Sequence, residues 1–395
     1  MNKFNFSRPI PLLILGDAPD LPSGLGRIGH DLAWLFSTMP EFRIGYLGRE
    51  GFGRAKYPWT QYNFPAADQW GETRIREAWQ DLSAGEYGVI LTIWDASRLL
   101  WFTHPLEMPA PTRAFLESDA FERWGYFMVD GSGVDPTRLP AEQTAVMSRY
   151  RRILTASQWG HGLAKASLPD HPDLNWLPHP INRTTFCQQD RGTARSFWGI
   201  GDRDPLVGCV MTNQQRKHWP VVMETIAQMP GVRLWLHTDR MLGYWNLHAL
   251  AIEYSMADRI VTDGRPLSDK DLAVRYSACD ATVLISGGEG FGYPVAESLS
   301  CGVPVVTGAY GAQAELVLPE MLLHPVTTQI ETSHNVRRAI YNAPVPAMGQ
   351  NTLAYTLARV RTRDWQAEQA VERVAHLDMP KLGLLFQKWA RKGIE

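Results

Sequence analysis

Short apolar runs of strand length alternate along the chain with stretches in which apolar residues recur at helical spacing. This alternation predicts doubly wound α/β structure built on parallel sheets. The runs fall into two groups, so we expect two such units. The expected strands are residues 10–15, 89–93, 125–129 and 152–155 in the first unit, and residues 206–211, 232–237, 259–262, 281–285 and 303–306 in the second.

The boundary between the two units is expected near Asn182, within the proline-containing stretch 177–186. We therefore assign residues 1–182 to an N-terminal Rossmann-like domain and residues 183–370 to a C-terminal one. The remaining residues, 371–395, form a C-terminal segment with its own helical pattern.

The helical pattern at the C-terminus covers residues 365–392, and a break is expected at Pro380, because proline interrupts a helix interior. Four apolar residues near the end of this stretch are expected to form its buried face. They are Leu384, Leu385, Phe386 and Trp389.

Length and composition limit the classes of protein to which the chain can belong. At 395 residues it is long enough for two domains with full cores, and its net charge of −2 argues against bulk electrostatic coating of nucleic acid or anionic membrane. Its four cysteines are scattered without a CxxC pair, which favours a reduced, cytoplasmic location over a disulfide framework or a zinc site. We see no signal peptide, and no apolar run approaches the roughly 20 residues of a membrane span.

The segment 284–306, LISGGEGFGYPVAESLSCGVPVV, places a glycine-rich loop between a strand pattern and a helix pattern. Pro294 suits the first turn of that helix, and Gly302 suits its end. The loop should therefore lie at the carboxyl end of a buried parallel strand, where the following helix begins.

Two glutamates flank this loop. The backbone N–H groups of Gly290, Phe291 and Gly292 are expected to face a diphosphate at the helix N-terminus, where the helix dipole favours anions. Carboxylates are poor neighbours for a diphosphate but accept hydrogen bonds from vicinal hydroxyls, so we assign Glu289 to a sugar and Glu297 to a ribose. These assignments predict a site for a nucleotide-linked sugar. The competing interpretation is a strand, turn and helix with solvated glutamates.

Taken as a whole, the segment resembles the signature of the retaining nucleotide-sugar glycosyltransferases of glycosyltransferase family 4. Residues 289–292 match the E-G-F-G motif of that family, and Glu297 matches its second glutamate. The resemblance implies a GT-B fold, with two Rossmann-like domains facing a cleft and a C-terminal helix that crosses back to the first domain. It assigns the acceptor to the first domain and the donor to the second. It also implies a UDP-sugar or GDP-sugar as co-substrate, with no metal or other cofactor required.

A second glycine loop lies near the N-terminus, where a strand pattern leads into a helix. Gly24, Gly26 and Gly29 satisfy G-x-G-x-x-G, which keeps an NAD-dependent oxidoreductase as a rival class. In that fingerprint the glycines follow the strand at once, whereas here residues 17–23 intervene. The loop also resembles the S-G-x-G loop of family 4, which implies that Gly24, Gly26 and Arg27 lie near the donor phosphate or the acceptor. A purely structural turn is the alternative.

Basic groups for a departing diphosphate are offered by Arg216 and Lys217. Cleavage of a sugar–phosphate bond moves negative charge onto the diphosphate, and a fixed guanidinium and ammonium stabilise that charge. The region resembles the Arg-x-x-x-Lys-Gly stretch of the family, from which it departs at Met211 and Thr212 and at His218, which replaces the glycine. The resemblance assigns Lys217 to the diphosphate and lets Arg216 replace the missing arginine. A solvated Arg-Lys pair is the competing interpretation.

Two aspartates follow expected strands of the first domain. Asp130 comes after an apolar run where the family has a residue near the transferred sugar, so we assign it to the sugar or to the acceptor hydroxyl. An Asx turn before Gly131 is the alternative. Asp95 is a weaker candidate of the same kind.

No metal site is expected from the sequence. The D-x-D patterns at residues 202–204 and 269–271 look like turn and helix-cap residues, since Ser268 with Asp271 indicates an N-terminal cap. None of the eleven histidines forms a paired ligand set.

The sequence does not identify the acceptor, and three classes of function stay open. Residues 43–62 interleave basic and aromatic side chains, among which we assign Arg54, Lys56 and Trp59 to the acceptor. Such a surface stacks bases and contacts phosphates, which retains a DNA glycosyltransferase acting on a 5-hydroxymethyl-pyrimidine base, in a host cytoplasm if virus-encoded. Aromatic rings stack equally well on sugars, and we prefer a glycan or small-molecule acceptor because these are commoner for the fold. A non-catalytic sugar-nucleotide binding protein is disfavoured because both Glu289 and Lys217 are present in the sequence.

Overall fold

The computed structural model divides the chain into two compact units, which we describe separately. The first unit comprises Met1–Pro180 and Pro380–Glu395, and the second comprises Ile181–Met379. The residues that the structure describes are 3–51, 56–64, 67–331, 335–341, 353, 356–357, 360 and 365–395.

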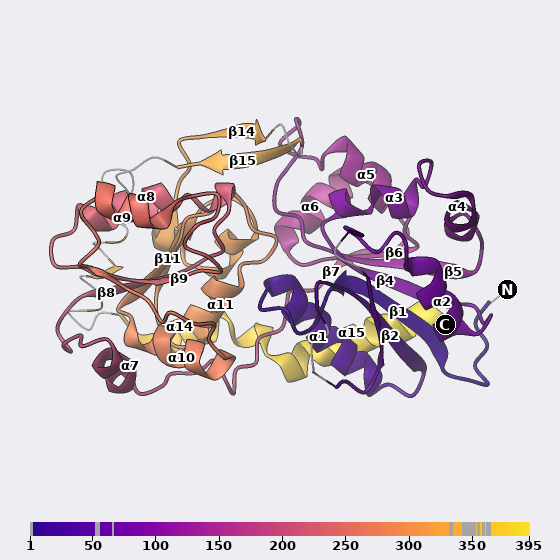
Figure 1. Ribbon diagram of the computed structural model, residues 1–395, viewed down its shortest axis with the longest axis horizontal. Coiled ribbons are helices and arrows are strands. Elements are labelled where there is room, and N and C mark those ends of the chain that lie inside the picture. The colour runs from indigo at the N-terminus through magenta and orange to yellow at the C-terminus, as the bar shows by residue number, and fades with distance from the viewer. Residues whose placement is uncertain are drawn as a thin grey trace. The chain divides into compact units, whose positions relative to one another are not determined.

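The described residues of the first unit form a seven-stranded parallel sheet in the order β3-β2-β1-β4-β5-β6-β7 (Figure 1). Its strands are β1 (Ile10–Asp17), β2 (Phe42–Arg49), β3 (Thr60–Asn63), β4 (Gly88–Trp94), β5 (Phe121–Phe127), β6 (Arg152–Thr155) and β7 (Leu174–Trp176). Its helices are α1 (Gly24–Ser37), α2 (Ile75–Ser83), α3 (Leu100–Thr103), α4 (Ala110–Leu116), α5 (Ala141–Met147), α6 (Gln158–Ser167) and α15 (Met379–Ile394). The chain leaves β1 in one direction and returns to β4 on its other side, so the strand order reverses between these two strands.

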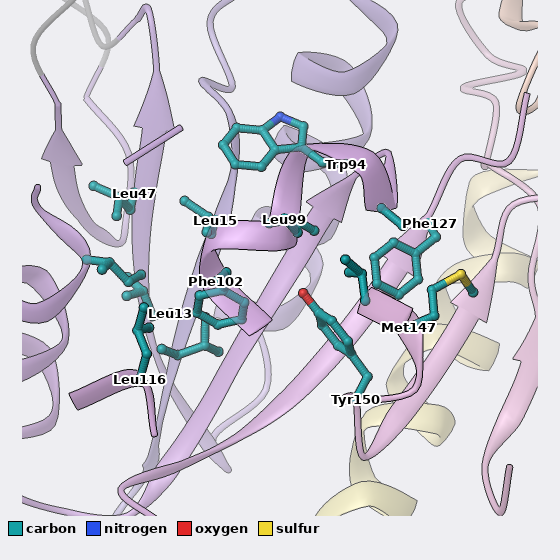
Figure 2. Close-up of a cluster of buried hydrophobic side chains, with 14 of the residues drawn as sticks. Leu13, Leu15, Leu47, Trp94, Leu99, Phe102, Leu116, Phe127, Met147 and Tyr150 are labelled. Atoms are coloured by element: carbon teal, nitrogen blue, oxygen red, sulfur yellow. The ribbon is translucent and has the colours of Figure 1, made fainter. Parts of the chain in front are cut away.

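Strand β1 is buried at all of its positions, as expected for a central strand covered by helices on both faces. A large apolar cluster lies against the sheet, and Figure 2 shows Leu13 and Leu15 of β1 grouped with Trp94, Phe102 and Tyr150. Complete burial of a side chain of this kind stabilises the fold by roughly 1.5–3 kcal/mol. The core therefore fixes the strands whose carboxyl ends carry the polar residues described below.

The C-terminal helix α15 belongs to the first unit, although residues 181–379 separate it from the rest of that unit in sequence. Its Phe386 and Trp389 rings pack against Tyr126 and Trp124 of β5, with centroids 5.4 and 5.1 Å apart. The Nη1 group of Arg152 also donates to the carbonyl of Trp389 at 2.5 Å. These contacts tie the end of the chain to β5 and β6.

Two expectations for this C-terminal region were wrong. The interruption comes before Pro380, between α14 (Ala367–Arg373) and α15, because a proline is tolerated in the first turn of a helix, where its missing N–H needs no partner. Leu384 and Leu385 are exposed at 67% and 47%, whereas Phe386 is fully buried. Leucines two residues and one residue before Phe386 point away from the face that it occupies, because a helix turns by about 100° per residue.

In its described residues, the second unit repeats the same architecture as a six-stranded parallel sheet in the order β10-β9-β8-β11-β12-β13 (Figure 1). Its strands are β8 (Leu206–Val210), β9 (Arg233–His237), β10 (Ile260–Val261), β11 (Ala281–Leu284), β12 (Val305–Gly308) and β13 (Leu322–Leu323). Its helices are α7 (Arg191–Phe197), α8 (Trp219–Ala227), α9 (Leu247–Glu253), α10 (Asp269–Ala278), α11 (Tyr293–Ser300) and α14. Here the strand order reverses between β8 and β11.

An antiparallel hairpin follows this sheet, formed by β14 (Thr327–Glu331) and β15 (Val336–Ile340). The sequence analysis did not expect it. The hairpin is held to the rest of the second unit by a hydrogen bond from the Ala339 N–H to the Gly287 carbonyl and by one from the Tyr310 hydroxyl to the Arg337 carbonyl, both 2.8 Å. It is therefore attached directly to the glycine-rich loop that follows β11.

Candidate functional site

The reversal point of the second sheet brings together the two segments that carry the chemistry. The stretch after β8 ends in a 3₁₀ turn, Gln215–Lys217, and the stretch after β11 contains the glycine-rich loop. In open α/β sheets, ligands bind outside the carboxyl ends of the strands where the strand order reverses. The two loops meet at such a point, since the Gly287 N–H donates to the Arg216 carbonyl at 2.7 Å.

Glu289 is the centre of an ion cluster. Its Oε1 atom accepts a hydrogen bond from Nη1 of Arg216 at 2.9 Å and another from the ammonium of Lys217. The same Nη1 of Arg216 donates to the Gly288 carbonyl at 2.7 Å. Lys217 and Glu289 are only 6% and 8% exposed, so the cluster is largely removed from solvent. The structure thus brings together Arg216, Lys217 and Glu289, which the sequence analysis selected separately.

The charges in this cluster control the ionisation of Glu289. Burial by itself would raise the pKa of this carboxyl group, but the charges of Arg216 and Lys217 outweigh burial, and hydrogen bonds from Lys217 and Ser286 add to their effect. The pKa of Glu289 therefore falls to about 2. The group is a carboxylate at every physiological pH and acts as a hydrogen-bond acceptor.

Helix α11 begins directly after the loop. Gly292 precedes it with a φ of 102°, a left-handed conformation that glycine adopts without steric cost, and Pro294 lies in the first turn. A Cβ atom on Gly292 would also stand only 3.1 Å from Cβ of Gln313. Phe291 is 4% exposed and its ring packs edge-on against Tyr293. Gly290, Phe291 and Gly292 therefore lead into the positive end of a helix dipole.

The loop that contains Gly311 and Ala312 packs against the backbone of Glu289. The Ala312 N–H donates to the Glu289 carbonyl at 3.0 Å. Gly311 has a φ of 91°, and a Cβ atom there would lie 3.0 Å from the Glu289 nitrogen. The close approach of these two backbones therefore requires glycine at position 311.

Glu297 lies on α11, the helix that follows the glycine-rich loop. Its carboxylate accepts a hydrogen bond of 2.9 Å from the Tyr276 hydroxyl of α10, and the two residues are 2% and 0% exposed. The Tyr276 ring packs edge-on against Trp235 of β9. Three elements of the second unit therefore fix the position of this carboxylate.

His218 follows the two cations with a φ of 35°, in the left-handed region that non-glycine residues rarely adopt. Burial lowers its pKa to about 4, despite an opposing hydrogen bond to the backbone of Ile285. Its ring packs edge-on against Tyr341. The left-handed backbone explains the glycine that the resemblance leads one to expect at this position.

Solved structures of other proteins have a similar fold. The structure aligns with sucrose-phosphate synthase from Thermosynechococcus elongatus at a TM-score of 0.74 and 18% identity, covering 98% of each chain. It aligns with the Anabaena protein HepE in complex with UDP-glucose at a TM-score of 0.69 and 14% identity, covering 97% of this chain and 100% of HepE. The fold is that of the GT-B glycosyltransferases.

Sequence comparisons point the same way. Residues 244–345 match the family model of glycosyl transferases group 1, a range that includes Glu289 and Glu297. The chain is 26% identical over 263 residues to D-inositol 3-phosphate glycosyltransferase of Mycobacterium marinum, covering 64% of this chain and 54% of that protein. The same enzyme of Mycobacterium tuberculosis matches at 26% identity, with 52% of its length covered. The alignments therefore span about half the length of these curated relatives.

The first unit carries the other predicted residues. Gly24, Gly26 and Arg27 form the first turn of α1, whose N-cap Ser23 accepts a hydrogen bond from the Gly26 N–H at 3.0 Å. A Cβ atom on Gly26 would meet the Leu21 carbonyl oxygen at 2.7 Å. This glycine therefore has a structural role at the start of the helix, whatever else the loop contacts.

The remaining candidates are dispersed over the first unit. Asp95 follows β4 directly, whereas Asp130 follows β5 by three residues and is half-buried. Lys56 is exposed, but Trp59 is buried at 6% exposure, with its ring stacked 4.7 Å from that of Tyr57. Arg54 lies outside the described residues.

Sequence reasoning missed a buried carboxylate at the end of β1. Asp17 ends β1 and is 8% exposed, and Nε1 of Trp94 donates to its carboxylate at 2.9 Å. Arg98 lies 3.8 Å from the same carboxylate, and its guanidinium covers the ring of Trp70. The available signal was an aspartate that directly ends an apolar strand, the same criterion that selected Asp95.

Among the residues that the structure describes, no helix combines the length and the apolar character needed to cross a bilayer. They also include no cluster of three or more His, Cys, Asp or Glu side chains arranged to hold a metal ion.

Proposed function

We propose that this protein is a retaining glycosyltransferase that moves a sugar from a nucleoside-diphosphate sugar to a hydroxyl group of a glycan or small molecule. The observation that carries the proposal is the convergence of Arg216, Lys217 and Glu289 at the reversal point of the second sheet, beside the N-terminus of α11. The GT-B fold and the group 1 match support the same class of reaction. UDP-glucose is the first donor to test, because HepE was solved with it.

The two cations and the helix start suit a diphosphate. Arg216 and Lys217 supply two positive charges, and the loop of Gly290, Phe291 and Gly292 leads into the positive end of α11. Hydrogen-bond donors that are fixed before the reaction stabilise negative charge as it develops on the leaving group. With two fixed cations in this position, we infer that the reaction needs no divalent metal.

Glu289 has a second task in this proposal. A bound diphosphate competes with Glu289 for the two cations. The Glu289 carboxylate has about four lone-pair sites, and those that the cations release become available to vicinal hydroxyls of the donor sugar. Glu297, fixed by Tyr276, is assigned to the ribose hydroxyls. Both carboxylates thus recognise hydroxyls at opposite ends of the donor.

Transfer with retention follows a front-face route in this proposal. The bond between the anomeric carbon and the donor phosphate oxygen breaks, and the acceptor oxygen forms its bond on the same face. The acceptor proton passes to the departing phosphate oxygen. Arg216 and Lys217 hold the nucleoside diphosphate as its charge increases, and no protein nucleophile is required.

Released nucleoside diphosphate tests the proposal. The purified protein is incubated with UDP- and GDP-sugars, with and without glycan, small-molecule and hydroxymethylated DNA acceptors. We expect release from one donor class, unaffected by EDTA, and a product whose anomeric configuration matches the donor by NMR. Lys217→Ala should lower the turnover by roughly 10²–10³, the cost of removing one fixed donor, while Lys270→Ala on the exposed start of α10 should not change it. Absence of release with every donor refutes the proposal.

A DNA acceptor is the second candidate, and one surface favours it. Trp34 on α1 is 53% exposed, and its ring lies 6.3 Å from that of Trp59. Lys56, three residues before Trp59 in the chain, is exposed. Exposed aromatic and basic side chains are the groups that stack on bases and contact phosphates. Stimulation of release by hydroxymethylated DNA, lost steeply with added salt, would favour this candidate over a glycan.

A further inference from the structure

The first sheet has its own reversal point, between β1 and β4, and three strands end there in polar or aromatic residues. Asp17 ends β1 and is the register partner of Arg49, which ends β2. Trp94 ends β4 and is followed by Asp95. In open α/β sheets, ligands bind outside the carboxyl ends of the strands where the strand order reverses, and this holds for the first sheet as for the second.

Asp17 is built into this edge. Trp94 Nε1 donates to its Oδ1 at 2.9 Å, the Ser23 hydroxyl donates to its Oδ2 at 3.4 Å, and the Tyr46 hydroxyl donates to its backbone carbonyl at 2.7 Å. Desolvation, followed by the charge of Asp17, raises the pKa of the Tyr46 phenol well above its ordinary value. An ionised carboxylate has about four lone-pair sites, so the two side-chain donors leave Asp17 with capacity for a ligand.

Arg98 lies between two carboxylates without a tight bond to either. Its Nη1 is 3.8 Å from Asp17 Oδ1 and its Nε is 3.5 Å from Asp95 Oδ2. In the described part of the chain, the buried Nη1 atom has no hydrogen-bond partner. A guanidinium carries five N–H donors, and a buried donor without a partner costs about 1–3 kcal/mol. A ligand oxygen would remove that cost.

The chemistry of the cluster selects neutral hydroxyl groups. A hydroxyl donates to a carboxylate while it accepts from a guanidinium, so one hydroxyl satisfies Asp17 and Arg98 together. A phosphate only accepts, and here it would stand beside two carboxylates. Arg49 is paired with Glu50 at 2.5 Å, so the two guanidiniums face three carboxylates and create no excess positive charge for a polyanion. The Trp70 ring is covered by both guanidiniums, at 4.8 and 4.9 Å, which leaves it poorly placed to stack on a base.

We propose that Asp17, Asp95 and Arg98 form a binding site for a neutral polyol, a sugar or cyclitol without a phosphate group. Because the donor is assigned to the second unit, this polyol is the acceptor. That last step rests on the proposed function, whereas the binding site itself does not. The proposal therefore narrows the acceptor class and argues against DNA at this edge of the sheet.

Direct binding tests the site independently of turnover. Ligand-observed NMR on the full chain measures binding of myo-inositol, D-glucose, D-fructose and sucrose, with D-inositol 3-phosphate and a hydroxymethylated DNA duplex as charged probes. Arg98→Lys and Asp17→Asn should weaken binding of the bound polyol at least tenfold. Asp135→Asn is the matched control, because Asp135 and Arg138 form a similar pair three residues apart on an exposed surface of the same unit. Far-UV circular dichroism checks that each variant is folded.

A second readout distinguishes this proposal from the function on which it partly rests. In the nucleoside diphosphate release assay, the polyol should stimulate release, and Arg98→Lys should raise the KM for the polyol at least tenfold while the KM for the donor changes less than threefold. If no neutral polyol binds, if only the charged probes bind, or if the two variants bind as the wild type does, the proposal is overturned. If nucleoside diphosphate is released but no polyol changes its release, only the acceptor assignment is overturned. If polyols bind but no nucleoside diphosphate is released, only the proposed function is overturned.

Discussion

Glu289 is a carboxylate that two cations keep ionised in a place where burial alone would favour its protonated form. Its pKa of about 2 in the folded protein lies below the ordinary value of 4.5. The unfolded chain therefore binds a proton in the pH range in which the folded chain does not, and stability rises with pH through that range. The contribution is complete above about pH 4.5 and is lost as pH falls toward 2.

Glu289→Gln should reduce the dependence of stability on pH. In the wild type, we expect Glu289 to contribute on the order of 3 kcal/mol of stability that disappears on acidification, since each pKa unit corresponds to 1.36 kcal/mol. The free energy of unfolding by urea, measured between pH 5 and 3, should fall less steeply in the variant. Glu253→Gln, on the exposed surface of α9, controls for the exchange itself. Equal slopes in Glu289→Gln and the wild type would contradict the ion cluster.

His218 is a residue whose backbone and side chain have opposite preferences. A left-handed conformation costs a non-glycine residue roughly 1–2 kcal/mol, and the partly buried ring, packed on Tyr341, offsets that cost. Loss of the ring removes the compensation and leaves only the backbone cost.

His218→Ala should therefore be less stable than His218→Gly, by about 1 kcal/mol. Both variants lose the ring, but only alanine retains the left-handed cost, so the order is opposite to that in a helix interior. Urea unfolding midpoints give the measurement. Ala84→Gly is the control at another left-handed position, with φ 49° at the end of α2, where only a methyl group is removed and the variant should gain stability. Equal stability of the two His218 variants would show that the backbone at 218 is not strained.

At the scale of elements, the loop that contains Glu289 packs against two other segments of the second unit. The loop of Gly311 lies against the backbone of Glu289, while the Ala339 N–H of β15 donates to Gly287. The backbones of Gly311 and Glu289 lie so close together that a single methyl group added at position 311 would force them apart.

Gly311→Ala should lower both stability and turnover. Its new Cβ would lie 3.0 Å from the Glu289 nitrogen and 3.2 Å from the Glu289 carbonyl oxygen, so the loop must move. Gly231→Ala is the matched control, because Gly231 has a similar φ of 77° with no atom within 4 Å of its added Cβ. Both variants place alanine at a positive φ, but only the one at position 311 crowds Glu289, so the larger loss of turnover in Gly311→Ala measures the displacement of Glu289. If the two variants turn over equally, the loop does not position the glutamate.

A hydrogen bond to a charged group joins α10 and α11. Tyr276→Phe removes the hydroxyl that donates to Glu297, and a bond to a charged group contributes about 1.5–3 kcal/mol. We expect a higher KM for the donor with a smaller change in kcat, because Glu297 is assigned to the ribose. Tyr254→Phe is the control, since the Tyr254 hydroxyl bonds Glu224 in a much more exposed place. A variant that loses stability but keeps its donor KM would separate Glu297 from donor binding.

The sequence predicted the central strands of both sheets, because buried parallel strands form unbroken apolar runs such as β1 and β4. It did not predict β2 as a strand, since the arginines and glycines of FRIGYLGR interrupt the apolar run. The sequence analysis also missed the edge strands β7 and β13, which have three and two residues. It did predict the equally short edge strand β10, at residues 259–262. Strand prediction therefore succeeded where an apolar run is present, most clearly in the centre of each sheet.

At the scale of the whole molecule, the end of the chain returns to the unit in which it began. Arg152 is 3% exposed and its guanidinium lies over the rings of Trp124 and Trp389, at 5.0 and 4.6 Å. It also pairs with Asp173 at 2.5 Å. The first unit therefore encloses this buried charge between β5 and the C-terminal helix α15.

Trp389→Ala should destabilise the first unit by about 3–5 kcal/mol, the usual cost of removing a large buried aromatic side chain. Leu385→Ala on the same helix should cost much less, because Leu385 is 47% exposed. Thermal unfolding of the two full-length variants gives the comparison. Similar melting temperatures for both would mean that α15 contributes little to the first unit.

By itself, the sequence determined the alternation of strands and helices, the two-unit organisation and the strand–loop–helix arrangement of the glycine-rich segment. These features depend on local patterns: strand-length apolar runs, a proline and a glycine at the ends of α11, and the spacing of Glu289 and Glu297. Local patterns are visible in sequence because the residues that create them are neighbours along the chain.

The tertiary structure alone decided which charges meet. Glu289 pairs with cations 72 and 73 residues away, and Arg152 is bonded to a carbonyl 237 residues away. Asp17 and Arg98 come together only because β1 and β4 are adjacent in the sheet. Such pairings depend on strand order and register, which the packing of the whole unit selects, so no local pattern in the sequence records them.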